Sequence, residues 1–243
     1  MKVFLVNLDR DTDRLASVDR QLKRLGVAYE RVPAVYGKDL PADSIKAHCN
    51  AFRWWCAIGR PPSLGEIGCA LSHFKIYERM LAEGISAACI IEDDIALSSS
   101  FASGLEKVAD EIDESRSQVV LLSDHSGLYS TRQSGKEFEI VKSAKGMCTD
   151  GYCLTQLAAR ALLKQNRPII VPCDMWKRWA CKGVIELFHL LPSVCRQDES
   201  FGSYTTIGRV AVDSLSTANK IWYKLNRLLG KTVDFILLIL TGK

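Results

Sequence analysis

The sequence predicts an α/β fold in which a mostly parallel sheet is flanked by helices. Apolar runs of strand length, at residues 3–8 and 87–91, alternate with segments whose apolar residues recur at helical spacing. The opening segment reads strand, helix, strand, an order that is typical of parallel sheets.

The N-terminal elements follow from this pattern. Residues 3–8 form a short apolar run that predicts a buried strand. A helix over residues 13–25 places Leu15, Val18, Leu22 and Leu25 on one face, and Gly26 is a natural stop for it. Residues 27–32 predict a second strand.

A long irregular segment over residues 36–63 comes next. It holds Trp54 and Trp55, which either stack on a sugar or uracil ring or pack the loop against the domain. A helix is then expected from Ser63, with Glu66 completing a capping box and Gly84 ending it. Its core face comprises Ala70, Phe74, Tyr77 and Leu81.

The remaining elements are expected in alternation. Strand 87–91 precedes a helix that begins at residues 98–100 and runs to Ile112, and residues 119–122 form another strand. Residues 126–150 are expected to form a polar, mostly irregular segment around a short strand at 138–141. Thr155 can cap a helix that runs to Leu163, and residues 184–191 predict a late strand.

Composition narrows the class of protein. The 243 residues make one large domain or two small ones, and a net charge of +4 without a Lys/Arg-rich run argues against nucleic acid as a partner. The nine cysteines include no Cys-x-x-Cys pair, which disfavours zinc, and we expect free, mostly structural thiols in a reducing cytosol. The N-terminal Met-Lys leads straight into a strand, so no signal peptide is expected.

The most informative feature is the triplet Glu92-Asp93-Asp94, which ends the apolar run at 87–91. Three carboxylates at the end of a buried strand repel one another and are costly to remove from water. A bound cation would offset that cost. Their oxygens suit Mg²⁺ or Mn²⁺, which commonly hold a diphosphate, and ligands of α/β sheets bind at this edge. The alternative is an acidic loop start that is exposed or caps the next helix.

Several blocks in fixed order carry a resemblance to a known family. They are Val3-Phe4-Leu5-Val6-Asn7-Leu8-Asp9-Arg10, Arg31-Val32-Pro33, Gly65-Glu66-Ile67-Gly68-Cys69-Ala70-Leu71-Ser72-His73, Glu92-Asp93-Asp94 and Gly151-Tyr152-Cys153-Leu154. Over roughly residues 1–200 the chain resembles glycosyltransferase family 25, the bacterial lipooligosaccharide transferases with the collagen galactosyltransferases as distant relatives. The most specific signal is the Gly65–His73 block followed about twenty residues later by the acidic triplet.

The resemblance implies a GT-A-like fold of Rossmann type, a UDP-sugar donor, commonly UDP-galactose, and a Mn²⁺- or Mg²⁺-assisted transfer to a lipooligosaccharide or related glycan. It matches Glu92, Asp93 and Asp94 to the family's acidic metal motif. This sequence has Glu92 where a strict Asp-x-Asp would have Asp, so Asp94 is the better metal ligand of the two.

Sugar transfer also needs a group that accepts the proton of the attacking hydroxyl. Asp124 follows strand 119–122, Asp150 precedes Gly151-Tyr152 in an expected turn at the foot of a helix, and Asp174 stands at a position where family members often carry Asp. We expect one of the three to be the general base of an inverting reaction, although each also fits a turn or a cap.

Donor binding is expected from residues around the first strand and in the helix of the specific block. Asn7, Asp9, Arg10 and Arg14 follow the strand, and Arg14 either meets a phosphate or pairs with Asp11 or Asp13. Ser72 and His73 lie in the specific block, where His73 either contacts a phosphate, orients a carboxylate, or is a satisfied helix histidine. His125 is a further metal or acceptor candidate, whereas His189 reads as a core residue and His48 as a loop residue.

The C-terminus divides the chain into a domain at residues 1–215 and a tail at residues 216–243. Lys220, Lys224, Arg227 and Lys231 recur on one helical face, opposite a Trp- and Leu-rich face. This amphipathic helix predicts peripheral binding to the anionic inner face of the cytoplasmic membrane. The alternative is a terminal helix that packs on the domain.

Two other classes of function compete with catalysis. A phosphoacceptor receiver domain also has paired acids after a strand. Such domains are about half this length, and they need a lysine at the end of a later strand, which this sequence does not offer. A nucleotide-sugar-binding protein or degenerate transferase homologue would keep the same residues without turnover.

Overall fold

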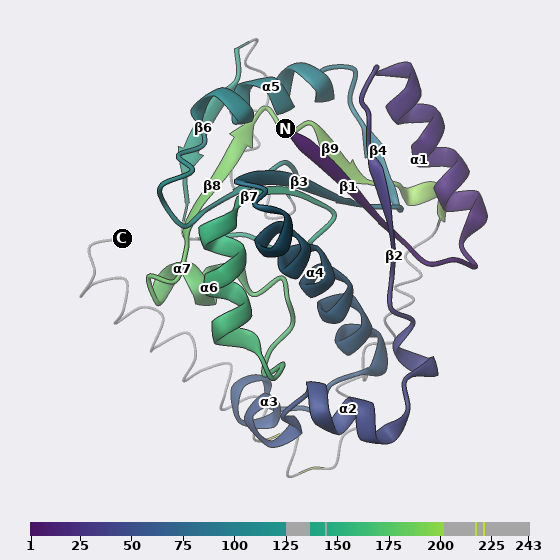
Figure 1. Cartoon of the computed structure of the whole chain (residues 1–243), viewed down its shortest axis with the longest axis vertical. Coiled ribbons are helices and arrows are strands. Elements are labelled where there is room, and N and C mark those ends of the chain that lie inside the picture. The colour runs from purple at the N-terminus through teal and green to yellow at the C-terminus, as the bar shows by residue number, and fades with distance from the viewer. Residues whose placement is uncertain (125–136, 144, 202–216, 218–220, 222–243) are drawn as a thin grey trace.

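The computed structural model describes residues 1–124, 137–143, 145–201, 217 and 221, which form a seven-stranded sheet between two layers of helices (Figure 1). The sheet contains β1 (Lys2–Asn7), β2 (Glu30–Pro33), β3 (Ala87–Glu92), β5 (Gln118–Leu121), β6 (Glu139–Lys142), β7 (Gly151–Thr155) and β8 (Glu186–Leu191). The α-helices are α1 (Thr12–Arg24), α2 (Ala42–His48), α3 (Ala51–Ile58), α4 (Leu64–Glu83), α5 (Phe101–Glu111), α6 (Gln156–Asn166) and α7 (Trp176–Cys181).

The strands lie in the order β2-β1-β3-β7-β5-β8-β6. Strands β1, β2 and β3 pair in parallel, as do β5 and β8, whereas β7 and β6 run antiparallel to their neighbours. Five of the seven strands therefore run in one direction, which confirms the predicted α/β class and the mostly parallel sheet.

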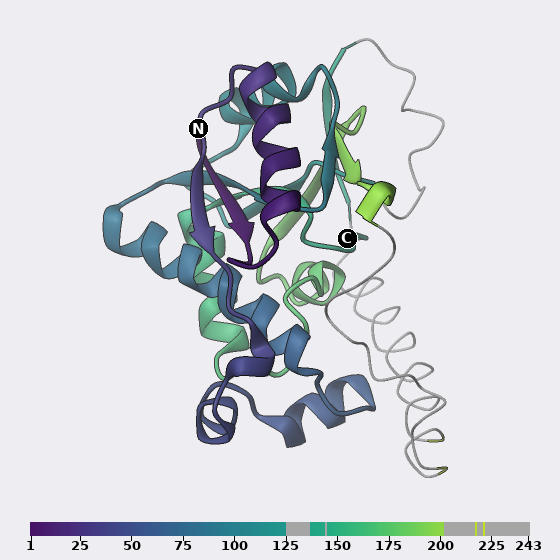
Figure 2. The same cartoon turned by 90° about the vertical axis from the view of Figure 1, so that its right-hand side faces the viewer.

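Alternating strand residues feed two separate cores, one on each face of the sheet (Figure 2). Phe4 and Ile90 point to the face covered by α4 and α6, while Leu5 and Ile91 point to the face covered by α1 and α5. The central strands β1, β3, β5 and β7 are buried on both faces, which is why they read as continuous apolar runs rather than as alternating ones.

The strongest helix signals in the sequence are confirmed. Helix α4 begins with a complete capping box between Ser63 and Glu66 and ends at Gly84 in the left-handed conformation. Helix α1 ends just before Gly26, whose φ of 67° is also left-handed. Thr155 caps α6 by accepting a hydrogen bond from the backbone N–H of Ala158.

The expectation of an irregular segment over residues 36–63 is wrong. A short 3₁₀ turn, η1 (Gly37–Asp39), is followed by helices α2 and α3. These helices have 7 and 8 residues, too few to display a clear helical period. Trp54 is fully buried in the core under α4, so it packs the domain and is not presented to a sugar or base.

Two further differences concern the second half of the chain. The segment Gly151–Thr155 is the buried strand β7, not a turn at the foot of a helix, because it pairs with both β3 and β5. The sequence also gave no signal for α7 or for the small two-stranded sheet of β4 (Ile95–Leu97) and β9 (Cys195–Gln197). A second short 3₁₀ turn, η3 (Glu199–Phe201), follows β9.

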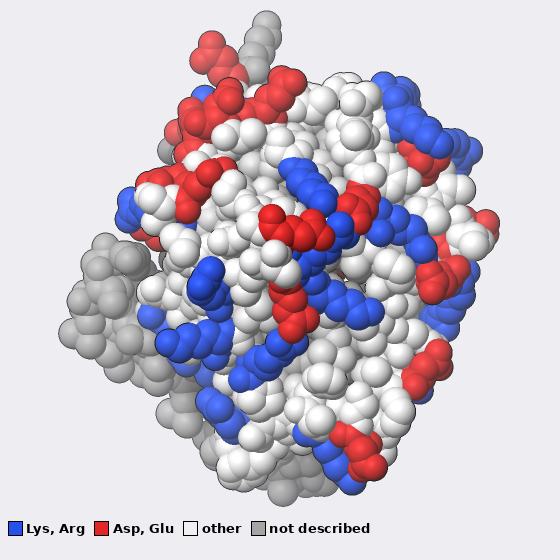
Figure 3. Space-filling model, viewed as in Figure 1, with Lys and Arg blue, Asp and Glu red and all other residues white. Residues whose placement is uncertain are grey.

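Basic and acidic side chains intermix across the middle of the face seen in Figure 1 (Figure 3). Among the exposed ion pairs, Lys2 of β1 pairs with Glu30 and Glu83, and Arg79 of α4 pairs with the same two carboxylates. The network ties the ends of β1, β2 and α4 together.

Candidate active site at the carboxyl edge of the sheet

Polar residues from four strands meet at one edge of the sheet. The parallel strands β1, β3 and β5 end at this edge, and the antiparallel strand β7 begins there. Asn7, the triplet Glu92–Asp94, Asp124 and Asp150 therefore come from neighbouring strands. The backbone N–H of Glu92 donates to the carbonyl of Asp150 over 2.9 Å, which joins two of these segments directly.

Asn7 at the end of β1 organises one side of the site. Its buried side chain donates to Asp93 Oδ2 over 2.6 Å and to the carbonyl of Asp11 over 3.1 Å. Its Oδ1 accepts from Arg31 Nε over 2.8 Å, and the same guanidinium pairs with the exposed Asp9 over 2.5 Å. Asn7 thus fixes the carboxylate of Asp93, while Asp9 lies outside this contact.

Arg14 of α1 is the cation that serves the acidic triplet. Its Nη1 lies 3.5 Å from a carboxylate oxygen of Asp93 and 3.5 Å from one of Asp94. Arg14 pairs with these residues and not with Asp11 or Asp13, the two alternative partners predicted for it. Burial raises the pKa of both Asp93 and Asp94, and the nearby charge of Glu92 raises that of Asp94 further. One arginine does not fully compensate two carboxylates at this separation.

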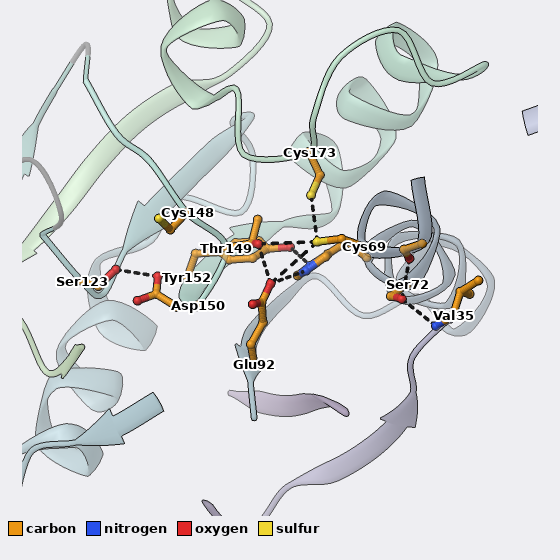
Figure 4. A network of polar contacts seen from close by, with 12 residues as sticks. Val35, Cys69, Ser72, Glu92, Ser123, Cys148, Thr149, Asp150, Tyr152 and Cys173 are labelled. Carbon is orange, nitrogen blue, oxygen red and sulfur yellow. Dashed lines mark hydrogen bonds and ion pairs between the residues drawn. The ribbon is translucent and has the colours of Figure 1, made fainter. Parts of the chain in front are cut away.

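Glu92 is turned toward α4 (Figure 4). Its Oε1 lies 3.1 Å from His73 Nε2 and accepts a hydrogen bond from Thr149 over 2.5 Å. His73 is fully buried, and its Nδ1 lies 2.7 Å from the hydroxyl of Tyr152, which in turn lies 2.7 Å from that of Tyr77. His73 therefore orients a carboxylate, one of the roles predicted for it.

The electrostatics make His73 and Glu92 an ion pair. Burial acts to lower the pKa of His73, but hydrogen bonds with Cys69 and Glu92 raise it to about 10. The pKa of Glu92 is lowered, because the contact with His73 outweighs the effect of burial. The pKa of the Cys69 thiol is raised by Cys173 and by burial, so the negative charge opposite His73 resides on Glu92.

Ser72 lies on another side of α4. Its hydroxyl accepts from the backbone N–H of Val35 over 2.8 Å and donates to the carbonyl of Gly68 over 2.7 Å. The structure thus uses Ser72 to join α4 to the segment after β2 and does not bring it to the carboxylates. Its predicted contact with the donor stays a prediction.

The three candidate bases differ in burial. Asp150 is buried and accepts from the hydroxyl of Ser123 over 2.8 Å, and its charge contributes to the raised pKa of Asp94. Asp124 is half-buried after β5. Asp174 is half-buried in the loop before α7, where its carbonyl accepts from the backbone N–H of Trp176. The charge of Asp150 thus acts directly on the triplet.

The other histidines have different positions. His189 is buried in β8 with Nε2 2.8 Å from the carbonyl of Lys145, as predicted for a core histidine. His48 ends α2 and is exposed, so it belongs to a helix and not to a loop. His125 lies outside the described residues.

Two further residues, absent from the predicted set, hold the site in place. Arg31 positions Asn7, and Thr149 positions Glu92. Arg31 belongs to the Arg31-Val32-Pro33 block that carries the family resemblance, so its type and place offered a signal. Thr149 offered none, because its contact with Glu92 spans 57 positions of the chain.

The residues present fit a hard divalent cation on the α1 side of the edge. Asp93 and Asp94 offer carboxylate oxygens, the ligands that Mg²⁺ and Mn²⁺ prefer. Their raised pKa values mark negative charge that the described part of the chain leaves under-compensated. A cation bound there would lower the cost of holding both groups ionised.

Comparison with known proteins identifies a family for this arrangement. The family model described as glycosyltransferase family 25 (LPS biosynthesis protein) matches residues 1–176. The matched region contains the specific block of α4, the acidic triplet, and Asp124, Asp150 and Asp174.

Individual relatives are distant and longer. A glycosyltransferase 25 family member of Drosophila pseudoobscura pseudoobscura is 28% identical over 188 residues, which cover 71% of this chain and 28% of the relative. Human procollagen galactosyltransferase 2 is 31% identical over 119 residues, which cover 47% of this chain and 19% of the relative. The human inactive glycosyltransferase 25 family member 3 is 25% identical over 178 residues, covering 70% and 28%.

The two ends of the triplet should respond oppositely to loss of charge. Glu92→Gln leaves the buried His73 without its counter-charge and should lower the free energy of unfolding by about 3 kcal/mol. Asp94→Asn removes a carboxylate whose ionisation burial disfavours, and should raise it by roughly 1 kcal/mol. Thermal unfolding in EDTA at pH 7.5 measures both. A melting temperature that falls equally in the two variants would contradict this assignment.

Proposed function

Because the chain belongs to glycosyltransferase family 25, we propose that it transfers a hexose, galactose, from a UDP-sugar to a glycan acceptor in a metal-dependent, inverting reaction. The observation that carries the proposal is the pair Asp93 and Asp94 at the carboxyl edge of the sheet, anchored by Asn7 and only partly compensated by Arg14. In a GT-A-like fold the donor diphosphate would bind at this edge.

Different residues of the chain would have separate roles in donor binding. A bound Mn²⁺ or Mg²⁺ would supply positive charge to the leaving diphosphate. Asp94 and Asp93 would hold this ion, and Asn7 would keep Asp93 in place through its 2.6 Å hydrogen bond. Arg14, 3.5 Å from each carboxylate, could move its guanidinium to a phosphate oxygen once the cation neutralises these groups.

Activation of the acceptor requires a second carboxylate. We assign Asp150 as the general base that takes the proton of the attacking hydroxyl, because it is buried beside the triplet, where its charge acts on Asp94. Ser123 would orient it by donating to Oδ1. A base on the side of the sugar opposite the diphosphate gives inversion at the anomeric carbon.

The identities of donor and acceptor rest on the family. Procollagen galactosyltransferases from human, mouse and zebrafish are among the relatives, which supports galactose as the sugar. The family description names LPS biosynthesis, which supports a lipooligosaccharide or other lipid-linked glycan as the acceptor. The chain spans about 28% of the length of the longer relatives, so their whole activities extend to it only as proposals.

A nucleotide-sugar-binding protein without turnover is the second candidate. An inactive member of the family is among the relatives, and its match covers 70% of this chain, against 71% for the Drosophila member. Similarity to the family is therefore compatible with loss of activity. Donor hydrolysis or transfer distinguishes the two functions, whereas donor binding does not.

The proposed site of action is the inner face of the cytoplasmic membrane. The two-part division at residues 1–215 and 216–243 and the basic, apolar pattern of the tail support this proposal. Most of the tail lies outside the described residues; its described residue Ile221 is 55% exposed. Across the described ranges, no helix combines the length and apolar character that a membrane span requires.

Asp94→Asn should abolish the effect of Mn²⁺ on donor binding, because it removes the charge that holds the ion. We expect UDP to bind the wild type at least about 10-fold more tightly with Mn²⁺ than with EDTA, a gain of about 1.4 kcal/mol that the variant loses. Isothermal titration calorimetry measures it. Asp43→Asn, on the exposed face of α2, is the control. An undiminished Mn²⁺ effect in Asp94→Asn would refute the metal assignment.

Asp150→Asn should bind the donor normally yet lose turnover by about 10²–10⁴-fold, the usual contribution of a general base. Asp124→Asn and Asp174→Asn test the other candidates under the same conditions. The assignment fails if Asp150→Asn keeps near-normal turnover with UDP-galactose. NMR of the product tests the mechanism separately, since a retained anomeric configuration excludes inversion.

Deleting residues 218–243 should reduce binding to vesicles that contain anionic lipid. Each basic residue near such a surface contributes roughly 1 kcal/mol, and salt should weaken the attraction as the Debye length falls from about 10 Å at 0.1 M to 3 Å at 1 M. Sedimentation with neutral and anionic vesicles measures the effect. Equal pelleting of the full chain and the deletion variant would exclude the tail as an anchor.

A further inference from the structure

A second group of metal-ligating side chains lies on the α4 side of the same strand end. Cys69 and His73 stand one turn apart on α4 and so share a face of the helix. Cys173 approaches Cys69 from the loop after α6 (Figure 4). The ligand atoms of Cys69, His73 and Cys173 all lie within 4.8 Å of one another. Glu92 enters the group from β3 through its contacts with His73 and Cys69.

We propose that Cys69, His73, Cys173 and Glu92 bind one zinc ion, at a site separate from the proposed donor metal. The assignment does not depend on glycosyl transfer, because it rests on the side chains alone. Two sulfurs, one imidazole nitrogen and one carboxylate oxygen are ligands that zinc accepts in tetrahedral sites.

Three of the six distances between these ligand atoms are close to the edges of a tetrahedral zinc site. With bonds of about 2.3 Å to sulfur and 2.0–2.2 Å to nitrogen and oxygen, the edges of a tetrahedral site are about 3.8 Å for sulfur–sulfur, 3.5 Å for sulfur–oxygen and 3.4 Å for nitrogen–oxygen. The observed distances are 3.5 Å for Cys69 Sγ to Cys173 Sγ, 3.9 Å for Cys69 Sγ to Glu92 Oε1 and 3.1 Å for His73 Nε2 to Glu92 Oε1.

The groups around the four ligands hold them in position. The hydroxyl of Tyr152 lies 2.7 Å from Nδ1, the ring nitrogen of His73 that would not bind zinc. A hydrogen bond at this nitrogen fixes the ring orientation of a metal-ligating histidine. Thr149 does the same for the carboxylate of Glu92. The loop that carries Cys173 is tied down by the buried Asn166, whose side chain bonds the backbone of Ile170 and Val171.

Binding changes protonation and transfers no electrons. Each thiol would lose its proton to solvent and bind as a thiolate, and the proton between His73 and Glu92 would be lost from Nε2 as the metal takes its place. Two thiolates and one carboxylate then balance a dication and leave one net negative charge. The same sulfurs could instead join as a disulfide, but that reaction needs an oxidant, whereas zinc requires none.

The test begins with the reduced full-length chain. After incubation with Zn²⁺ and removal of free metal, elemental analysis should find one zinc per chain. Cobalt substitution should give the strong visible absorption of a tetrahedral site together with thiolate-to-cobalt charge transfer. A reduced chain that holds no zinc, or a cobalt spectrum without thiolate bands, overturns the proposal, and neither measurement depends on a variant that must fold.

Variants locate the ion. Cys173→Ser should weaken zinc binding by at least about 100-fold, and Cys173→Ala should match it, while the exposed Cys56→Ser on α3 is the control for surface thiols and should bind as the wild type does. Circular dichroism confirms that each variant folds. Equal zinc binding by Cys173→Ser and the wild type would overturn the assignment. The assignment would also fail if the reduced chain bound no zinc and the oxidised chain formed a Cys69–Cys173 disulfide.

Discussion

The central constraint on this molecule is that three successive carboxylates must be held at the end of a buried strand. Each needs its own partner, because carboxylates this close repel one another and lose solvation. Glu92 is paired with His73 and Thr149, Asp93 with Asn7 and Arg14, and Asp94 with Arg14 at 3.5 Å. The partners come from α4, from the segment before β7, from β1 and from α1. The packing of these elements on β3 therefore determines how much negative charge at this edge of the sheet remains available to bind a cation.

The close packing of α4 against the segment after β2 determines the position of one of these partners, His73. A side chain at Gly68 would place a Cβ 2.5 Å from the carbonyl oxygen of Val35 and 2.7 Å from the backbone nitrogen of Gly37, and one at Gly37 would collide with the carbonyl of Leu64. Only glycine allows this approach, because backbone atoms cannot give way as a flexible side chain can. Ser72 then ties the helix to Val35. The block from Gly65 to His73 thus fixes the position of α4, and with it the point at which His73 meets Glu92.

The parts of the fold that sequence predicted well are those governed by local pattern. The capping box of Ser63 and Glu66, the stop at Gly84 and the apolar run that ends in the triplet each need only neighbouring residues. Helices α2 and α3 were missed because they are too short to show a period, and β7 was misread because Gly151-Tyr152 resembles a turn out of context. Within the site, residue types could be named but partners could not, since the contacts of Arg14 with Asp94 and of Thr149 with Glu92 span 80 and 57 positions.

The alternation of side chains along β3 separates the roles of residues that are adjacent in the acidic motif. Ile90 belongs to the core under α4 and Ile91 to the core under α1, so Glu92 and Asp93 leave the strand toward opposite faces. Glu92 accordingly meets His73 of α4, while Asp93 meets Asn7 and Arg14. In an extended chain Asp94 would return to the side of Glu92, but the strand ends at Glu92 and Asp94 turns to Arg14 instead. The departure from a strict Asp-x-Asp is then understandable, since the longer Glu92 reaches a buried partner while the two aspartates remain together on the α1 side.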